Sequence, residues 1–221
     1  MPGGRRDFFS TVARGSLGMA GLAALDWSDL PAQQAASHWD LSWIRRLKGK
    51  YRAVFDVPEL EDGFGVWRAV IWRKQYSQVF GIPEESLSTV LILRSDAVAF
   101  ALNQEFWGRY EAGKRWNVSD PSTGQPTFRN PVVGREGQWA LPAQFSGFTL
   151  DALMKGGTVV LVCSLALRDC ATLVAEKDKV TMEEADRRVH SMLVPGVILQ
   201  PSGVFAAVLA QDSGCRYVRA S

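Results

Sequence analysis

A cysteine at the junction of a predicted strand and a predicted helix is the residue of this chain best placed to do chemistry. Cys163 ends the short apolar run TVVLVC (158–163), which is typical of a strand buried on both faces, and Ser164 opens the helical pattern SLALRDCATLVAE. Unpaired N–H groups and the positive end of a helix dipole would then surround its sulfur and favour the thiolate, the nucleophilic form. The alternative is a small buried apolar side chain, the usual state of a free cysteine.

The other two cysteines are placed where they could pair with each other. Cys170 lies seven residues beyond Cys163 on the same predicted helix, which by helical rise is about 10 Å and too far for a disulfide between them. Cys215 opens the last predicted strand, at the opposite edge of the sheet from Cys163. A helix that returns antiparallel to the strands would carry Cys170 toward that edge. We therefore expect that a Cys170–Cys215 disulfide can form and that Cys163 is the remaining thiol.

Alternating strands and helices must position Cys163. The runs that predict strands are 51–57, 88–94, 158–163, 196–200 and 215–220. Helical patterns separate them: Ser95 is expected to cap a helix over 96–110, and Thr181 with Glu184 forms a capping box before the fourth strand. This alternation predicts an α/β fold: a single domain with a mostly parallel five-stranded sheet and helices on both faces. Ligands bind such sheets beyond the carboxyl ends of the strands, where Cys163 is expected.

A long insertion, residues 111–148, interrupts the alternation with many glycines and prolines and no periodicity. Such segments serve as lids, binding loops or oligomer arms, or they are floppy insertions. As a lid over the crevice at Cys163, its aromatic residues would exclude water and its arginines would stabilise an anionic thiolate or ligand. The aromatic residues are Trp116, Phe128 and Trp139, and the arginines are Arg115, Arg129 and Arg135. The competing interpretation is that the same aromatic residues form a subunit interface.

Two segments carry a family resemblance. The turn VVLVCSLALRDC and the later segment MLVPGVILQPSGVFAAVLAQDSGCRYV resemble the DsrE/DsrF/TusD-like superfamily, the small α/β proteins of sulfur relay. In that family a strand, a cysteine and a helix precede a Gly-Val strand, a small-residue helix with Gln or Glu near its end, and a closing Gly-x-x-Tyr strand. The matching residues are Gly196, Val197, Gly203, Gln211, Gly214 and Tyr217. The resemblance covers residues 50–110 and 149–219.

The resemblance implies a function for Cys163. It places this residue at the persulfide-carrying cysteine of the family, which implies sulfur-transferase-like chemistry: a thiolate attacks a sulfane-sulfur donor, and the persulfide passes to an acceptor thiol. A fold does not by itself settle function. The rival hypothesis is therefore a non-enzymatic, homo-oligomeric module that holds a small ligand or a partner in a pocket under the insertion.

The N-terminal segment resembles a twin-arginine export signal. Arg5 and Arg6 precede Phe8 and Phe9, and a mildly apolar run without a carboxylate follows over 11–25. The resemblance implies that the twin-arginine translocase delivers the folded protein to the periplasm. Residues 1–45 are then signal and linker, and 46–221 form the α/β domain. Cleavage after Ala24 or near Ala36 is conceivable, and an amphipathic first helix is the alternative interpretation. The apolar run is too short for a permanent membrane span.

The composition argues against other partners. Arg5, Arg6 and Arg14 against Asp7 account for the net charge of +2, so the rest of the chain is near neutral and lacks the basic stripe that binds nucleic acid. Two histidines and three cysteines are too few and too scattered for a metal site. No glycine-rich phosphate loop occurs, and the sequence identifies no cofactor.

Two further groups of titratable residues are weaker candidates. His190 falls on the polar side of a predicted helix and is expected on the surface. Acidic residues near the end of the first strand either line the crevice or, more simply, form a solvated loop. These are Asp56, Glu59, Glu61 and Asp62.

Overall fold

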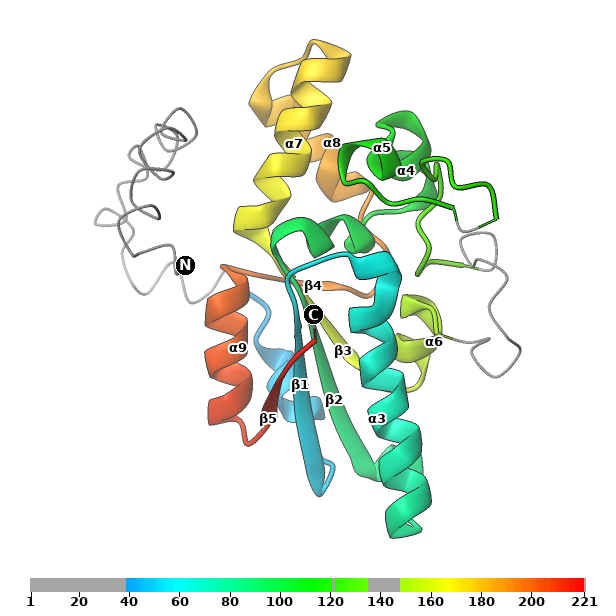
Figure 1. Ribbon diagram of the computed structural model, residues 1–221. Helices are drawn as coiled ribbons and strands as arrows, with labels where there is room; N and C mark the ends of the chain where they lie inside the picture. Colours follow the sequence, from blue (N-terminus) through cyan, green and yellow to red (C-terminus); the bar gives the residue numbers. More distant parts are fainter. Residues whose placement is uncertain (1–38, 121, 135–147, 221) are drawn as a thin grey trace, which may run out of the picture. The chain divides into compact units, whose positions relative to one another are not determined.

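Five parallel strands form the sheet of this protein in the computed structural model, which describes residues 39–120, 122–134 and 148–220 (Figure 1). The strands are β1 (Tyr51–Val57), β2 (Leu87–Leu93), β3 (Val159–Cys163), β4 (Ile198–Gln200) and β5 (Arg216–Arg219). Their spatial order is β4-β3-β2-β1-β5, and every neighbouring pair is parallel. The predicted α/β class with a five-stranded sheet is confirmed, and the sheet is parallel throughout.

Strands β2 and β3 are buried on both faces, and their side chains are mostly apolar. Every residue of β2 and of β3 is buried, as expected for parallel strands that helices cover on both sides. Alternate side chains enter two separate cores. Phe55, Leu91 and Val160 face one core, and Val54, Val90 and Leu161 face the other.

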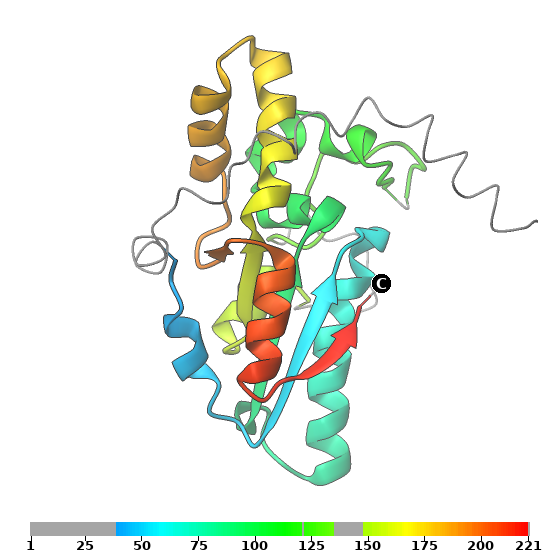
Figure 2. The same cartoon turned by 90° about the vertical axis from the view of Figure 1, so that its left-hand side faces the viewer.

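The larger core lies on the first face of the sheet and extends beyond the carboxyl ends of the strands, and several helices form it. They are α3 (Phe64–Phe80), α4 (Gln104–Arg109), α5 (Ala112–Arg115), α6 (Leu150–Lys155), α7 (Ser164–Asp178) and α8 (Met182–Ser191), with the 3-10 turns η4 (Glu61–Gly63), η5 (Glu84–Ser86) and η6 (Ser95–Ala101) in the connections. The second face is covered by α9 (Gly203–Asp212) and by the 3-10 turn η3 (Ser42–Arg46). Figure 2 shows α9 in front of the sheet, running roughly alongside the strands, with α3 on the far side.

The chain reverses its direction across the sheet after β4. From β1 to β4 each new strand is added on the same side, and then α9 crosses the second face to place β5 beside β1. The buried side chains of α7 belong to the first core and those of α9 to the second. The connections after β3 and β4 therefore leave the sheet on opposite faces. Such a switch point is where open α/β sheets bind ligands, and here it lies between Cys163 and Gln200.

The prediction of a Cys170–Cys215 disulfide is wrong. Helix α7 does not return over the sheet: it rises beyond the carboxyl ends of the strands and packs against α8 and η6 (Figures 1 and 2). Cys170 is therefore buried in the first core, whereas Cys215 precedes β5 and is buried in the second. All three cysteines are free thiols. The prediction failed because it assumed that α7 runs back over the sheet, antiparallel to the strands.

The predicted helix over 96–110 divides into two elements. Ser95 does not cap a helix but starts η6 with a left-handed φ of 49°, and α4 begins after Asn103, whose side chain accepts a hydrogen bond from the backbone N–H of Phe106. The capping box at Thr181 is confirmed in part, because its hydroxyl accepts from the backbone N–H of Glu184 at the start of α8. Among the described residues, no helix is both long and apolar enough to cross a membrane.

The described part of the insertion is packed rather than floppy. Val118 and Val132 are buried in the first core, and Ser119 pairs with Pro126 in an isolated antiparallel bridge. Asn130 is fully buried and ties the segment to η6 through hydrogen bonds to the backbone carbonyls of Phe100 and of Leu102, the residue after η6. The predicted ligand residues Trp139 and Arg135 lie outside the described residues, as do the export-signal residues Arg5, Arg6, Phe8 and Phe9.

Candidate functional site at the carboxyl ends of the strands

Cys163 occupies the place that the sequence predicts. It is the last residue of β3 and the N-cap of α7, with extended backbone angles (φ −73°, ψ 109°) and no side-chain capping hydrogen bond. Its side chain is 6% exposed. The sulfur is thus held at the start of a 15-residue helix, where the helix dipole favours an anion.

Two polar atoms close to Cys163 in the sequence and in the sheet have no hydrogen-bond partner among the described residues. One is the hydroxyl of Ser164, the first residue of α7, and the other is Oε1 of Gln200, which pairs with Cys163 in the register of β3 and β4. Gln200 Nε2 donates to the backbone carbonyls of Asp40 at 3.0 Å and Leu199 at 2.7 Å. These bonds fix the orientation of the amide, so Oε1 is an acceptor without a donor. Leaving such a buried group unpaired costs about 1–3 kcal/mol, which a donating ligand would offset.

A second polar group joins β1, β2 and β5 at the same edge. The guanidinium of Arg94, directly after β2, donates from Nε to Asp56 Oδ1 at 2.6 Å and from Nη2 to Oδ2 at 2.8 Å. The Tyr217 hydroxyl of β5 donates to Asp56 Oδ2 at 2.6 Å. The hydrogen bond to Asp56 raises the pKa of Arg94 and, together with burial, that of Tyr217. Asp56 is thus a buried structural carboxylate, whereas Glu61 is an exposed residue of the turn η4.

The position of Arg94 is fixed by the start of α9. A Cβ on Gly203 would lie 2.5 Å from Arg94 Cδ and 2.7 Å from its Cβ, so only glycine allows this approach. Sequence reasoning noted Asp56, Gly203 and Tyr217 but missed Arg94. The available signal was a charged residue directly after a mostly apolar strand, together with an acid inside another predicted strand.

The arginines predicted to act on Cys163 lie elsewhere. Arg115 is on α5, with its guanidinium 5.8 Å from the ring centre of Trp116, and its charge acts on Cys170. The Arg129 side chain is exposed, and Phe128 beside it is 57% exposed, too open to exclude water. Within the described part of the insertion, the predicted grouping of Arg115 with Cys163 is therefore not seen.

His190 lies on the surface, as expected. His190 is exposed on α8, with Nδ1 2.8 Å from the backbone carbonyl of Asp186. The described residues contain no group of three or more histidine, cysteine, aspartate or glutamate side chains arranged to hold a metal ion.

Comparisons with known proteins identify no family. No family model matches the chain, and no curated protein matches it. A solved structure of a protein of unknown function from Methanobacterium thermoautotrophicum is similar, with a TM-score of 0.41 and 17% sequence identity over 77% of this chain and 99% of that one. At this level of similarity the match identifies no function.

Proposed function

We propose that this protein is an exported, DsrE-like α/β protein that binds or transfers sulfane sulfur through Cys163. The proposal is supported by the position of Cys163 in the fold and by the polar groups next to it in the sequence and in the sheet. Cys163 caps α7 at the switch point of the sheet. The next residue, Ser164, has an unpartnered hydroxyl, and Gln200, the register partner of Cys163 on β4, has an unpartnered acceptor. A persulfide at Cys163 carries an S–H group that can donate to such an acceptor.

The remaining cysteines are unsuited to nucleophilic chemistry. Burial raises the pKa of Cys170 to about 12 and that of Cys215 to about 11. Both are therefore protonated thiols at neutral pH, and the thiolate is the attacking form. Cys163 is instead placed at the start of α7, at the carboxyl ends of the strands.

The proposed reaction is an exchange of sulfur between thiols. The Cys163 thiolate attacks the outer sulfur of a persulfide donor, the S–S bond of the donor breaks, and a new S–S bond forms at Sγ. The donor leaves as a thiolate with the electron pair of the broken bond. One S–S bond is lost and one is formed, so no oxidant or reductant is consumed. Transfer to an acceptor thiol repeats the same step with Cys163 as the leaving group.

Uptake of sulfur should depend on Cys163 alone. After incubation with inorganic polysulfide and removal of the excess, mass spectrometry of the intact chain is expected to show the addition of one sulfur atom that a thiol reductant removes. A Cys170→Ala/Cys215→Ala variant should gain the same mass, and Cys163→Ala should gain none. Absence of the adduct in the wild type, or its persistence in Cys163→Ala, would contradict the proposal and favour the non-enzymatic ligand-binding module.

Export should depend on the arginine pair. The Arg5→Lys/Arg6→Lys variant keeps the positive charge but loses the twin-arginine pattern, so its periplasmic yield is expected to fall to a small fraction of that of the wild type. The matched control is Arg14→Lys, the same change in the same segment outside the pair. Fractionation of cells that express each form measures the yield, and equal yields of the two variants would exclude this route.

A further inference from the structure

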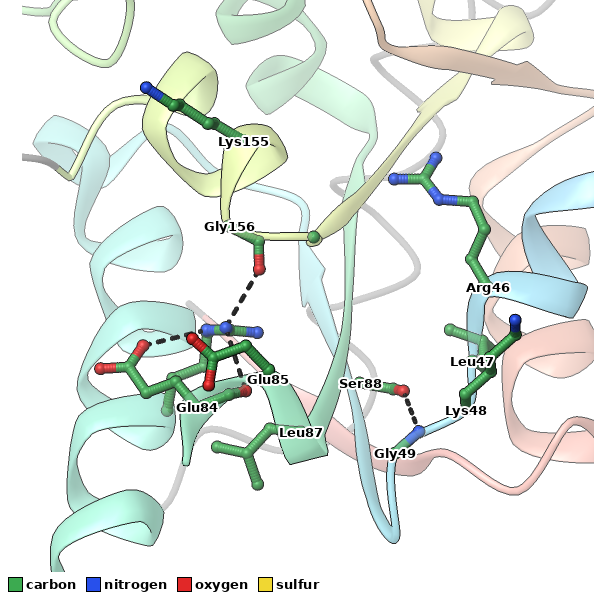
Figure 3. Close-up of a pocket in the computed structure, with 12 residues that line it drawn as sticks. Arg46, Leu47, Lys48, Gly49, Glu84, Glu85, Leu87, Ser88, Lys155 and Gly156 are labelled. Atoms are coloured by element: carbon green, nitrogen blue, oxygen red, sulfur yellow. Dashed lines mark hydrogen bonds and ion pairs between the residues drawn. The ribbon is translucent and has the colours of Figure 1, made fainter. Parts of the chain in front are cut away.

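A cavity of about 580 Å³ lies at the amino ends of the strands, at the opposite edge of the sheet from Cys163 (Figure 3). Four separate parts of the chain line it: the end of η3 with its link to β1, Arg73 of α3, the turn η5 with the start of β2, and the end of α6 with its link to β3. This volume is within the range of roughly 300–1,000 Å³ that holds small molecules. Sequence reasoning did not anticipate the cavity, because these segments are far apart along the chain.

One wall of the cavity is built around a buried arginine. Arg73 of α3 is 5% exposed, and its guanidinium donates to Thr89 Oγ1 at 3.2 Å and to the backbone carbonyls of Glu84 at 3.2 Å and Gly156 at 3.1 Å. Its Nε also lies 3.4 Å from Glu84 Oε2. These contacts join α3 to β2, to η5 and to the residue after α6. They also neutralise the carboxylate of Glu84.

The other wall is held by a close approach of two backbone segments. The N–H of Gly49 donates to Ser88 Oγ at 2.8 Å, and a Cβ on Gly49 would lie 2.5 Å from the carbonyl oxygen of Ser86. Only glycine fits there, so the link that carries Arg46 and Lys48 is fixed. Figure 3 shows Arg46 and Lys48 on the side of the cavity opposite Glu84 and Glu85.

The charges around the cavity are unbalanced. Among the described interactions, the side chains of Arg46, Lys48 and Lys155 take part in no hydrogen bond or ion pair, and the carboxylate of Glu85 is likewise unpaired. Because Arg73 and Glu84 neutralise each other, the other charged residues of the lining are three cations and one carboxylate. Their summed potential attracts anions, and arginine and lysine side chains bind phosphate and carboxylate oxygens through charge-assisted hydrogen bonds.

We propose that this cavity binds a small polyanion that carries phosphate or carboxylate groups, with Arg46, Lys48 and Lys155 as its ligands. The carboxylate of Glu85 repels the negative charge of the ligand. The site therefore favours a molecule that also presents a hydrogen-bond donor or a cation next to Glu85. The proposal is independent of the sulfur chemistry, since the cavity and Cys163 lie at opposite edges of the sheet.

Calorimetric titration of the full chain with inorganic pyrophosphate and, separately, with citrate tests the site and distinguishes phosphate from carboxylate ligands. Each of Arg46→Ala, Lys48→Ala and Lys155→Ala should weaken binding of the preferred anion about tenfold, the effect of losing one charge-assisted hydrogen bond. Glu85→Gln should strengthen it several-fold, because it removes a repulsive charge.

The matched controls are Arg168→Ala and Lys114→Ala, which remove exposed cations outside the cavity. They should leave the affinity unchanged, as should Cys163→Ala. Binding of neither anion would overturn the proposal. It would also be overturned by controls that weaken binding as much as the cavity variants, which would show attraction to the whole surface rather than to a site.

Discussion

Replacing Asp56 by alanine is expected to lower the free energy of unfolding by about 3 kcal/mol. Its carboxylate accepts two hydrogen bonds from Arg94 and one from Tyr217, and these three residues tie together the carboxyl ends of β1, β2 and β5. Alanine would strand a partly buried guanidinium without its counter-charge. Removing one partner of a buried pair costs about 3–5 kcal/mol, and the lower end applies because the Arg94 side chain is 28% exposed.

Urea denaturation measures this loss, with Glu59→Ala as the control. Glu59 forms an ion pair with Arg219 in the same region, but both side chains are more than half exposed, so its removal should cost less than about 1 kcal/mol. In a double variant, Arg94→Met should recover part of the stability that Asp56→Ala loses, because it removes the stranded charge. Equal losses for Asp56→Ala and Glu59→Ala would show that the network contributes little.

The strands and the place of Cys163 were predictable because burial leaves a local pattern in the sequence. Both faces of β2 and β3 are covered, so almost every residue in them is apolar, and a run of that length between helical patterns indicates a buried strand. The start of α7 directly after Cys163 then follows from the change of pattern. The prediction that Cys163 lies at the carboxyl ends of the strands was correct for the same reason, because parallel strands all end on the same side of the sheet.

The features that failed depend on tertiary packing. The direction of α7 is set by its contacts with α8 and η6, and no local pattern in SLALRDCATLVAE distinguishes a helix that returns over the sheet from one that rises beyond it. The cavity at the amino edge likewise exists because the topology brings Arg46, Glu85 and Lys155 together. The ion pair of Asp56 and Arg94 was visible in the sequence only in part, as a charged residue within or directly after an apolar strand. That the two residues pair could not be predicted, because it depends on which strands are neighbours in the sheet.

Replacing Asn130 by alanine should release the described part of the insertion from the domain. This side chain is fully buried. It donates to the backbone carbonyls of Phe100 at 2.9 Å and Leu102 at 2.7 Å and accepts from the N–H of Val132 at 3.0 Å. Alanine leaves three backbone groups without their partner, each at a cost of about 1–3 kcal/mol when it stays buried. We expect the free energy of unfolding to fall by about 3 kcal/mol in total. The total is at the low end because water can reach some of these groups once the segment moves.

Amide hydrogen exchange identifies which part of the chain the Asn130→Ala change destabilises. If Asn130 holds the insertion in place, the amides of Val118, Thr127 and Val132 should exchange faster by about a hundredfold, since 3 kcal/mol is about two factors of ten. Amides of β2 should change less, because they are protected by the rest of the sheet. The control is Gln125→Ala, which removes an exposed amide side chain from the same segment and should alter neither group. Unchanged protection in the Asn130→Ala variant would mean that the apolar contacts of Val118 and Val132 suffice to hold the insertion on the core.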